Sequence, residues 1–109
     1  MRIPKRIHLA GMTIDVVLTD TLYKNKKVIA EACYPEQKIM LDTTMLTYEG
    51  MSQAYCHELM HWIFYILNED QIRQNEKLVD TAAHLLHQSL KEEDYYTKEE
   101  LKGKTLTCP

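Results

Sequence analysis

Apolar and polar residues alternate through the first half of the chain. Every second position from Thr13 to Leu18 is aliphatic, which is typical of a strand with one buried face. Two further short strands are predicted over Val28–Cys33 and Lys38–Asp42. Residues Tyr34–Gln37 form a predicted turn between them, because Pro35 fixes φ at a value that suits a tight reversal. We therefore expect the second and third strands to pair as a hairpin.

A helical repeat replaces this alternation in the second half. Apolar residues recur every three or four positions across about Glu49–Leu67, which predicts a long helix. A second long helix is predicted from Ile72 or Asn75 through Lys91. The charged tail, residues 92–109, is expected to add a short helix or an edge strand.

These elements indicate an α+β fold. The N-terminal half supplies a short antiparallel sheet of about three strands, packed on the two long helices. A chain of 109 residues suits a single domain with a modest core, so we expect one domain over residues 1–109. The composition, 45% hydrophobic and 27% charged, is that of an ordinary globular protein and changes nothing in this picture.

Charge and cysteine content narrow the range of partners and compartments. The formal net charge of −3 gives no electrostatic reason to expect nucleic acid as a partner. No apolar run is long enough to cross a bilayer, and Met1–Arg6 lacks the apolar core of a signal peptide, so no membrane association is expected. Cys33, Cys56 and Cys108 are too few for a disulfide framework and indicate reduced thiols in a cytoplasmic protein.

The first long helix carries the motif H-E-x-x-H at residues 57–61. Helical geometry puts His57 and His61 one turn apart on the same face, together with Glu58, Ala54 and Tyr65. The opposite sector of the helix is apolar. A buried helix with hydrogen-bonded histidines is the alternative, but it gives no reason for two histidines and a glutamate to share one face. The pattern therefore favours a metal site.

Zinc suits this pattern because it binds neutral imidazole nitrogens and keeps an open coordination position in catalytic sites. Glu58 lies about 100° round the helix from His57. From there it can face a water molecule bound to the metal and act as a general base. The sequence thus predicts a metal-dependent hydrolase with Zn²⁺ as cofactor, most simply a small peptidase.

A third protein ligand is expected from the second long helix, because catalytic zinc sites use three protein ligands. Glu76, Asp80 and His87 lie on one stripe of that helix, but His87 is roughly 16 Å along the axis from Glu76 and cannot share its metal. We favour Glu76 as the ligand, with Asp80 accepting a hydrogen bond from the far nitrogen of a ligating histidine. Two alternatives stay open, namely Asp80 as the ligand with Glu76 outside the site, and a pair formed by Asp80 and His84.

The motif at 57–61, followed by E-x-x-x-D at Glu76–Asp80, resembles the gluzincin group of zinc metallopeptidases. Within that group, the strand-rich N-terminal half and the segments Tyr34–Asp42 and Asp80–Leu86 are similar to small phage and mobile-element metallopeptidases of the ImmA/IrrE type. The resemblance covers about residues 12–91. Its motifs are specific for the zinc site and weak for the substrate.

This resemblance implies a minimal zincin-like fold and assigns the site. His57, His61 and Glu76 would bind zinc, and Glu58 would act as general base. The strand around Ile39–Leu41 would line the substrate cleft. The implied activity is zinc-dependent hydrolysis of peptide bonds, with a protein or peptide as the partner.

Two points remain open at this level. A group must stabilise the developing oxyanion, and Tyr34, Tyr65, His84 and His87 are chemically able to do so. The chain also lacks a visible substrate subdomain, so the alternative function is a non-catalytic protein-binding module on a zinc metallopeptidase scaffold. Hydrolysis of a non-peptide amide is a third and weaker interpretation.

Overall fold

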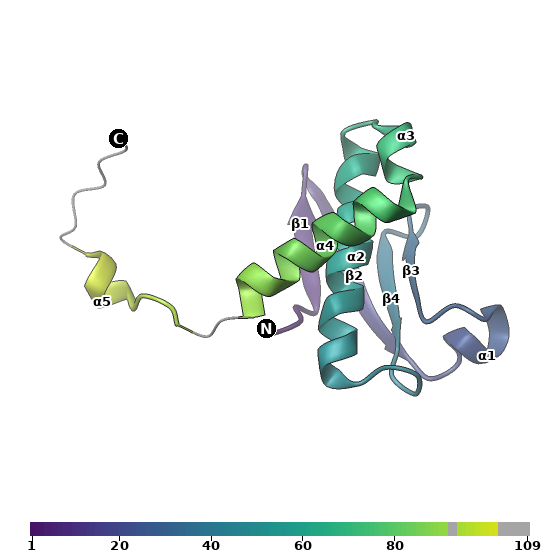
Figure 1. Cartoon of the computed structure of the whole chain (residues 1–109), viewed down its shortest axis with the longest axis horizontal. Helices are drawn as coiled ribbons and strands as arrows, with labels where there is room; N and C mark the ends of the chain where they lie inside the picture. Colours follow the sequence, from purple (N-terminus) through teal and green to yellow (C-terminus); the bar gives the residue numbers. More distant parts are fainter. Residues whose placement is uncertain (92–93, 103–109) are drawn as a thin grey trace.

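Four strands form one mixed sheet in the computed structural model, which describes residues 1–91 and 94–102 (Figure 1). The strand order is β1-β2-β4-β3. Helices α2 and α4 lie over one face of this sheet, so the fold is α+β as predicted. The strands and helices have the following bounds: β1 Arg6–Leu9, β2 Met12–Thr19, α1 Leu22–Lys26, β3 Ala30–Cys33, β4 Lys38–Asp42, α2 Tyr48–Ile66, α3 Asp70–Arg73, α4 Glu76–Lys91 and α5 Lys98–Leu101.

The expectation of an antiparallel sheet of about three strands was wrong in two respects. Strand β1, which was not predicted, pairs antiparallel with β2 through a two-residue turn, in which Ala10 and Gly11 have φ of 51° and 78°. Strand β4 runs parallel to β2, because the chain passes through α1, forms β3 at the edge of the sheet and then turns back to place β4 between β3 and β2. The predicted hairpin of β3 and β4, with its turn at Tyr34–Gln37, is confirmed.

Helix α2 begins where Thr47 caps it and ends one residue before its predicted end. The Thr47 hydroxyl accepts a hydrogen bond from the Gly50 N–H at 3.0 Å, which satisfies one of the donors left over at the helix start. Its buried residues Tyr55, Cys56 and Trp62 pack on the aliphatic side chains of β2 and β4. This packing fixes the rotation of the helix and turns the opposite side, which carries the motif, away from the central strands.

Helix α4 packs against α2 and buries Val79, Ala83 and His87. Asn75 precedes it and accepts a hydrogen bond from the Leu78 N–H at 3.1 Å, so Glu76 is the first residue of the helix. The short helix α3 fills the connection between α2 and α4. No helix of the described chain is long and apolar enough to span a membrane.

The tail forms the short helix α5 rather than an edge strand, as far as residues 94–102 show. A capping box between Thr97 and Glu100 accounts for this turn of helix, which lies apart from the sheet (Figure 1). The rest of the predicted tail, including Cys108, lies outside the described residues. Cys33 and Cys56 are both present as thiols.

Candidate metal and catalytic site

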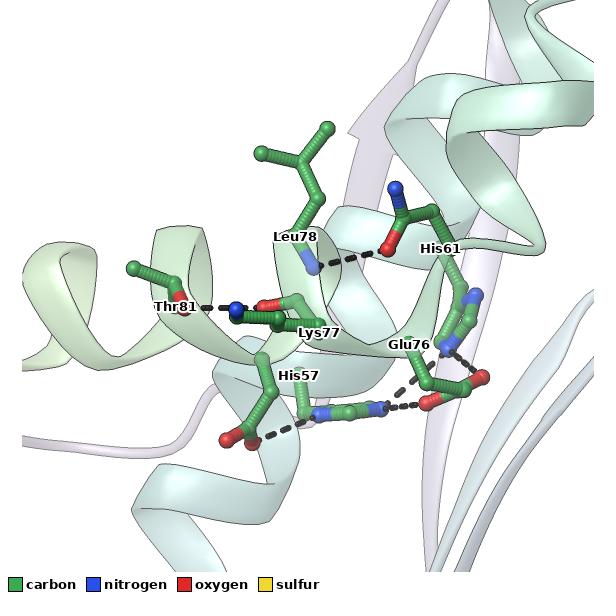
Figure 2. Close-up of polar contacts among 8 residues, drawn as sticks. His57, His61, Glu76, Lys77, Leu78 and Thr81 are labelled. Atoms are coloured by element: carbon green, nitrogen blue, oxygen red, sulfur yellow. Dashed lines mark hydrogen bonds and ion pairs between the residues drawn. The ribbon is translucent and has the colours of Figure 1, made fainter.

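Helix α2 and the first turn of α4 bring together three side chains that could hold a metal ion (Figure 2). The Glu76 carboxylate lies 3.1 Å from Nε2 of His57 and 3.1 Å from Nε2 of His61. The two Nε2 atoms are 3.2 Å apart. All three residues were predicted as ligands from the sequence, and the structure gathers their donor atoms at one point.

These separations can be compared with the geometry that zinc requires. Tetrahedral zinc with bonds of 2.0–2.1 Å places neighbouring ligand atoms about 3.3 Å apart. The observed spacings of 3.1–3.2 Å are close to that value. Two imidazoles and one carboxylate are also a donor set used in catalytic zinc sites. The residues present therefore fit a zinc ion.

Asp80 lies one helical turn after Glu76 and contacts the other nitrogen of His57. Its Oδ1 is 3.3 Å from His57 Nδ1. A proton held on Nδ1 by this carboxylate leaves the lone pair of Nε2 directed at the shared point. The geometry thus places Asp80 beside the His57 ring, and it does not place Asp80 or His84 among the three converging donors.

Burial favours the neutral, metal-binding form of His61. It lowers the pKa of this imidazole, and the nearby Glu76 carboxylate partly opposes that effect. A backbone hydrogen bond with Arg73 also raises the pKa of His61 and so opposes part of the effect of burial. Metal ligands must be deprotonated, so a lowered pKa suits a histidine that binds a cation near neutral pH.

Glu58 is buried between α2 and β3, with 8% of its surface exposed. Burial raises its pKa to about 7. The charges of Glu76 and Glu31 also raise this pKa, while His57 and a backbone hydrogen bond from Ala32 lower it. A carboxyl group that titrates near neutral pH can both accept and return a proton, as a general base of hydrolysis must.

Two depressions open on either side of Glu58. One, of about 400 Å³, is mainly apolar, with Ile29, Ala30, Leu46 and Ala54 among its walls. The other, of about 370 Å³, is polar and includes Tyr34, Arg73 and Glu76. His57 borders the first and His61 borders the second, so the triad lies between two different environments.

The strand beside the site is β3, and the expectation that Ile39–Leu41 lines the cleft was wrong. Strand β4 lies between β2 and β3, and both Ile39 and Leu41 are fully buried. Strand β3 is at the edge of the sheet, and Ala30 and Ala32 border the two depressions. The pattern of Lys38–Asp42 looks the same for an inner strand as for an edge strand, which explains the error.

The four candidates for oxyanion stabilisation lie in different places. Tyr34 borders the polar depression. Tyr65 stacks on the Tyr34 ring, with centroids 4.2 Å apart, and is 41% exposed. His84 is exposed on α4 beside another depression. His87 is buried, with its Nε2 2.8 Å from the Ser52 hydroxyl. The geometry therefore favours Tyr34 for this role.

Arg73, in α3, is a site residue that the sequence did not reveal. Its guanidinium lies 5.2 Å from the centroid of the Tyr34 ring and 5.8 Å from that of Tyr65. Burial raises the pKa of the Tyr34 hydroxyl, and the adjacent Arg73 partly offsets this increase. Only the chain fold brings Tyr34 and Arg73 together, so no local signal could have found this pair.

Comparisons of this chain with protein-family models, with curated proteins and with solved structures gave no match.

Proposed function

We propose that the protein is a zinc-dependent peptidase with a minimal zincin-like fold. One observation carries this proposal, namely that His57, His61 and Glu76 converge within hydrogen-bonding distance of one another beside the buried Glu58. The resemblance of the two helical motifs to those of gluzincins supports the same conclusion. His57, His61 and Glu76 would hold the zinc ion, which when bound supplies an acidified water and polarises the scissile carbonyl.

The side chains around the triad account for the remaining steps. Glu58 accepts a proton from the attacking water and donates it to the leaving amine, a contribution of typically 10²–10⁴-fold. The Tyr34 hydroxyl donates a hydrogen bond to the oxygen on which negative charge develops. Asp80 keeps His57 in the tautomer that binds through Nε2.

The open edge of β3 offers a place for an extended peptide. The Asp42 N–H donates a hydrogen bond to the Ile29 carbonyl. Because the backbone groups of an antiparallel strand point alternately to its two sides, those of Glu31 and Cys33 then face β4. The backbone groups of Ala30 and Ala32 consequently point to the open edge, where the Ala32 backbone also contacts the Glu58 carboxyl group. A peptide bound there as an additional strand would cross the triad and present side chains to the two depressions.

The test is a comparison of the wild-type protein with the Glu58→Gln variant. We expect both to bind one zinc ion per chain, measured by elemental analysis. Only the wild type should cleave a pool of unfolded cytosolic proteins, with activity reduced at least 10²-fold in the variant. Glu69→Gln, which makes the same charge change at an exposed position after α2, serves as the matched control.

Each outcome has a defined meaning. Equal proteolysis by wild type and Glu58→Gln contradicts the assigned base. Absence of zinc in the purified protein and no uptake of added zinc contradict the metal site. Stoichiometric zinc without cleavage of any substrate by the wild type points to the alternative function, a protein-binding module on this scaffold.

A further inference from the structure

The polar depression next to the triad contains an arginine with donor capacity left over. The Arg73 Nη2 donates to the Asp70 carboxylate at 3.3 Å, and its Nε is enclosed but has no hydrogen-bond partner among the described residues. The rings of Tyr34 and Tyr65 hold the guanidinium in place. A guanidinium carries five N–H donors; one contacts the Asp70 carboxylate, another contacts the Tyr34 hydroxyl, and the enclosed Nε–H does not face the depression, so the remaining donors are on the two Nη atoms.

Arg73 is the cationic side chain of the polar depression, which also contains the carboxyl groups of Glu31, Glu58 and Glu76. Among the residues that border the two depressions, Arg73 alone carries a permanent positive charge. The nearby Glu31 is engaged with Lys26 at 3.1 Å, and Glu76 faces the two histidines. The planar fork of arginine matches a carboxylate, with which it forms paired, charge-assisted hydrogen bonds.

We infer that Arg73 is a specificity-determining residue that selects peptides with an acidic side chain next to the scissile bond. This inference rests on the proposed peptidase function and adds the substrate class. The acidic side chain occupies the polar depression, while a residue on the other side of the bond faces the apolar depression at Ile29 and Ala54. Substrates should therefore combine an acidic and an apolar residue around the cleaved bond.

Peptide binding to zinc-loaded Glu58→Gln protein tests this inference without turnover. The probes are acetylated, fluorescently labelled hexapeptides with glutamate or glutamine at each of the four central positions, measured by anisotropy. At one position we expect the glutamate peptide to bind about tenfold tighter than its glutamine counterpart, as for a charge-assisted hydrogen bond. Adding Arg73→Gln should bring this ratio close to one, and Arg73→Lys should give an intermediate value.

The ratio separates recognition from a structural role. Arg73 also supports Tyr34, so its loss can weaken all peptides alike, but a structural role leaves the ratio of glutamate to glutamine affinity unchanged. The control Lys38→Gln removes a cation that pairs with Glu36 and borders neither depression, and it should preserve the ratio. An unchanged ratio in Arg73→Gln, or equal binding of both peptides at every position, would overturn the inference.

The same peptides, incubated with the wild-type protein, distinguish this inference from the proposed function. Binding that depends on Arg73 and glutamate, without any cleavage, contradicts the peptidase function and supports the role of Arg73. Cleavage without a preference for glutamate supports the peptidase function and contradicts the role of Arg73. No measurable binding of any peptide contradicts both.

Discussion

The two acidic residues of α4 offer a quantitative test of the site, because their contacts differ. The Glu76 carboxylate lies 3.1 Å from both Nε2 atoms, whereas Asp80 contacts only the far nitrogen of His57 at 3.3 Å. Structural zinc sites with four ligands bind with about 10–16 kcal/mol, so one direct ligand contributes roughly 3 kcal/mol. Glu76→Gln should therefore weaken zinc binding by about 100-fold or more.

Replacement of Asp80 should have a smaller effect. Carboxylates that orient a ligating histidine typically account for 10- to 100-fold in metal affinity. Asp80 has 63% of its side chain exposed, which screens its charge and places it at the lower end of that range. We expect Asp80→Asn to bind zinc about tenfold more weakly than the wild type.

Competition with a chromogenic zinc chelator at fixed pH and ionic strength measures these affinities. The variant Glu69→Gln controls for the loss of one negative charge, and thermal denaturation of each metal-free variant checks that it folds. Wild-type affinity in Glu76→Gln would refute the assignment of the third ligand. A larger loss in Asp80→Asn than in Glu76→Gln would exchange the two roles, which is the alternative that the sequence left open.

Two further predictions concern the core. Burial raises the pKa of Tyr55 to about 12 and that of Cys56 to about 11. The unfolded chain loses these protons first, so the contribution of these two groups to the free energy of unfolding should be constant below about pH 8.5 and fall as the pH rises toward 12. Urea denaturation should show a smaller fall in Tyr55→Phe, and an equal fall would contradict the assignment. In a Cys108→Ser background, Ellman's reagent should label the partly exposed Cys33 of the native protein rapidly and the buried Cys56 only on unfolding; comparable rates would show that this part of the core opens readily.

The sequence was sufficient to predict the features that depend on a single helix, namely its approximate bounds and the residues that share one of its faces. The periodicity of the second half predicted α2 and α4 within a few residues, because each carries a continuous apolar stripe. Helical spacing then placed His57 and His61 on one face and Asp80 one turn beyond Glu76. The structure adds how the two helices lie relative to each other. Asn75 caps the start of α4, and the first residue of that helix, Glu76, contacts both imidazoles of α2.

Contacts between distant segments were beyond prediction from local patterns. The order of the strands depends on which strand pairs with β2 after the chain has passed through α1. An alternating pattern of apolar residues predicts a strand but does not indicate its neighbours in the sheet. Strand β1 was missed because its alternation extends over only four residues. The small side chains of Ala30 and Ala32 could have indicated close approach of another element, and α2 does pack against β3 with Glu58 near Ala32. The contact of Arg73 with Tyr34 had no such signal.

The charges around the triad give a physical reason to expect a cation there. His57 contacts a carboxylate at each ring nitrogen, but a neutral imidazole has one N–H and can donate to only one of them. Among the ion pairs of residues 1–91 and 94–102, Glu76 and Asp80 pair with histidines alone, and Glu58 adds a third carboxyl group nearby. A divalent cation held by His57, His61 and Glu76 would replace repulsion between lone pairs with coordination. It would also let the single proton of His57 stay on Nδ1, beside Asp80.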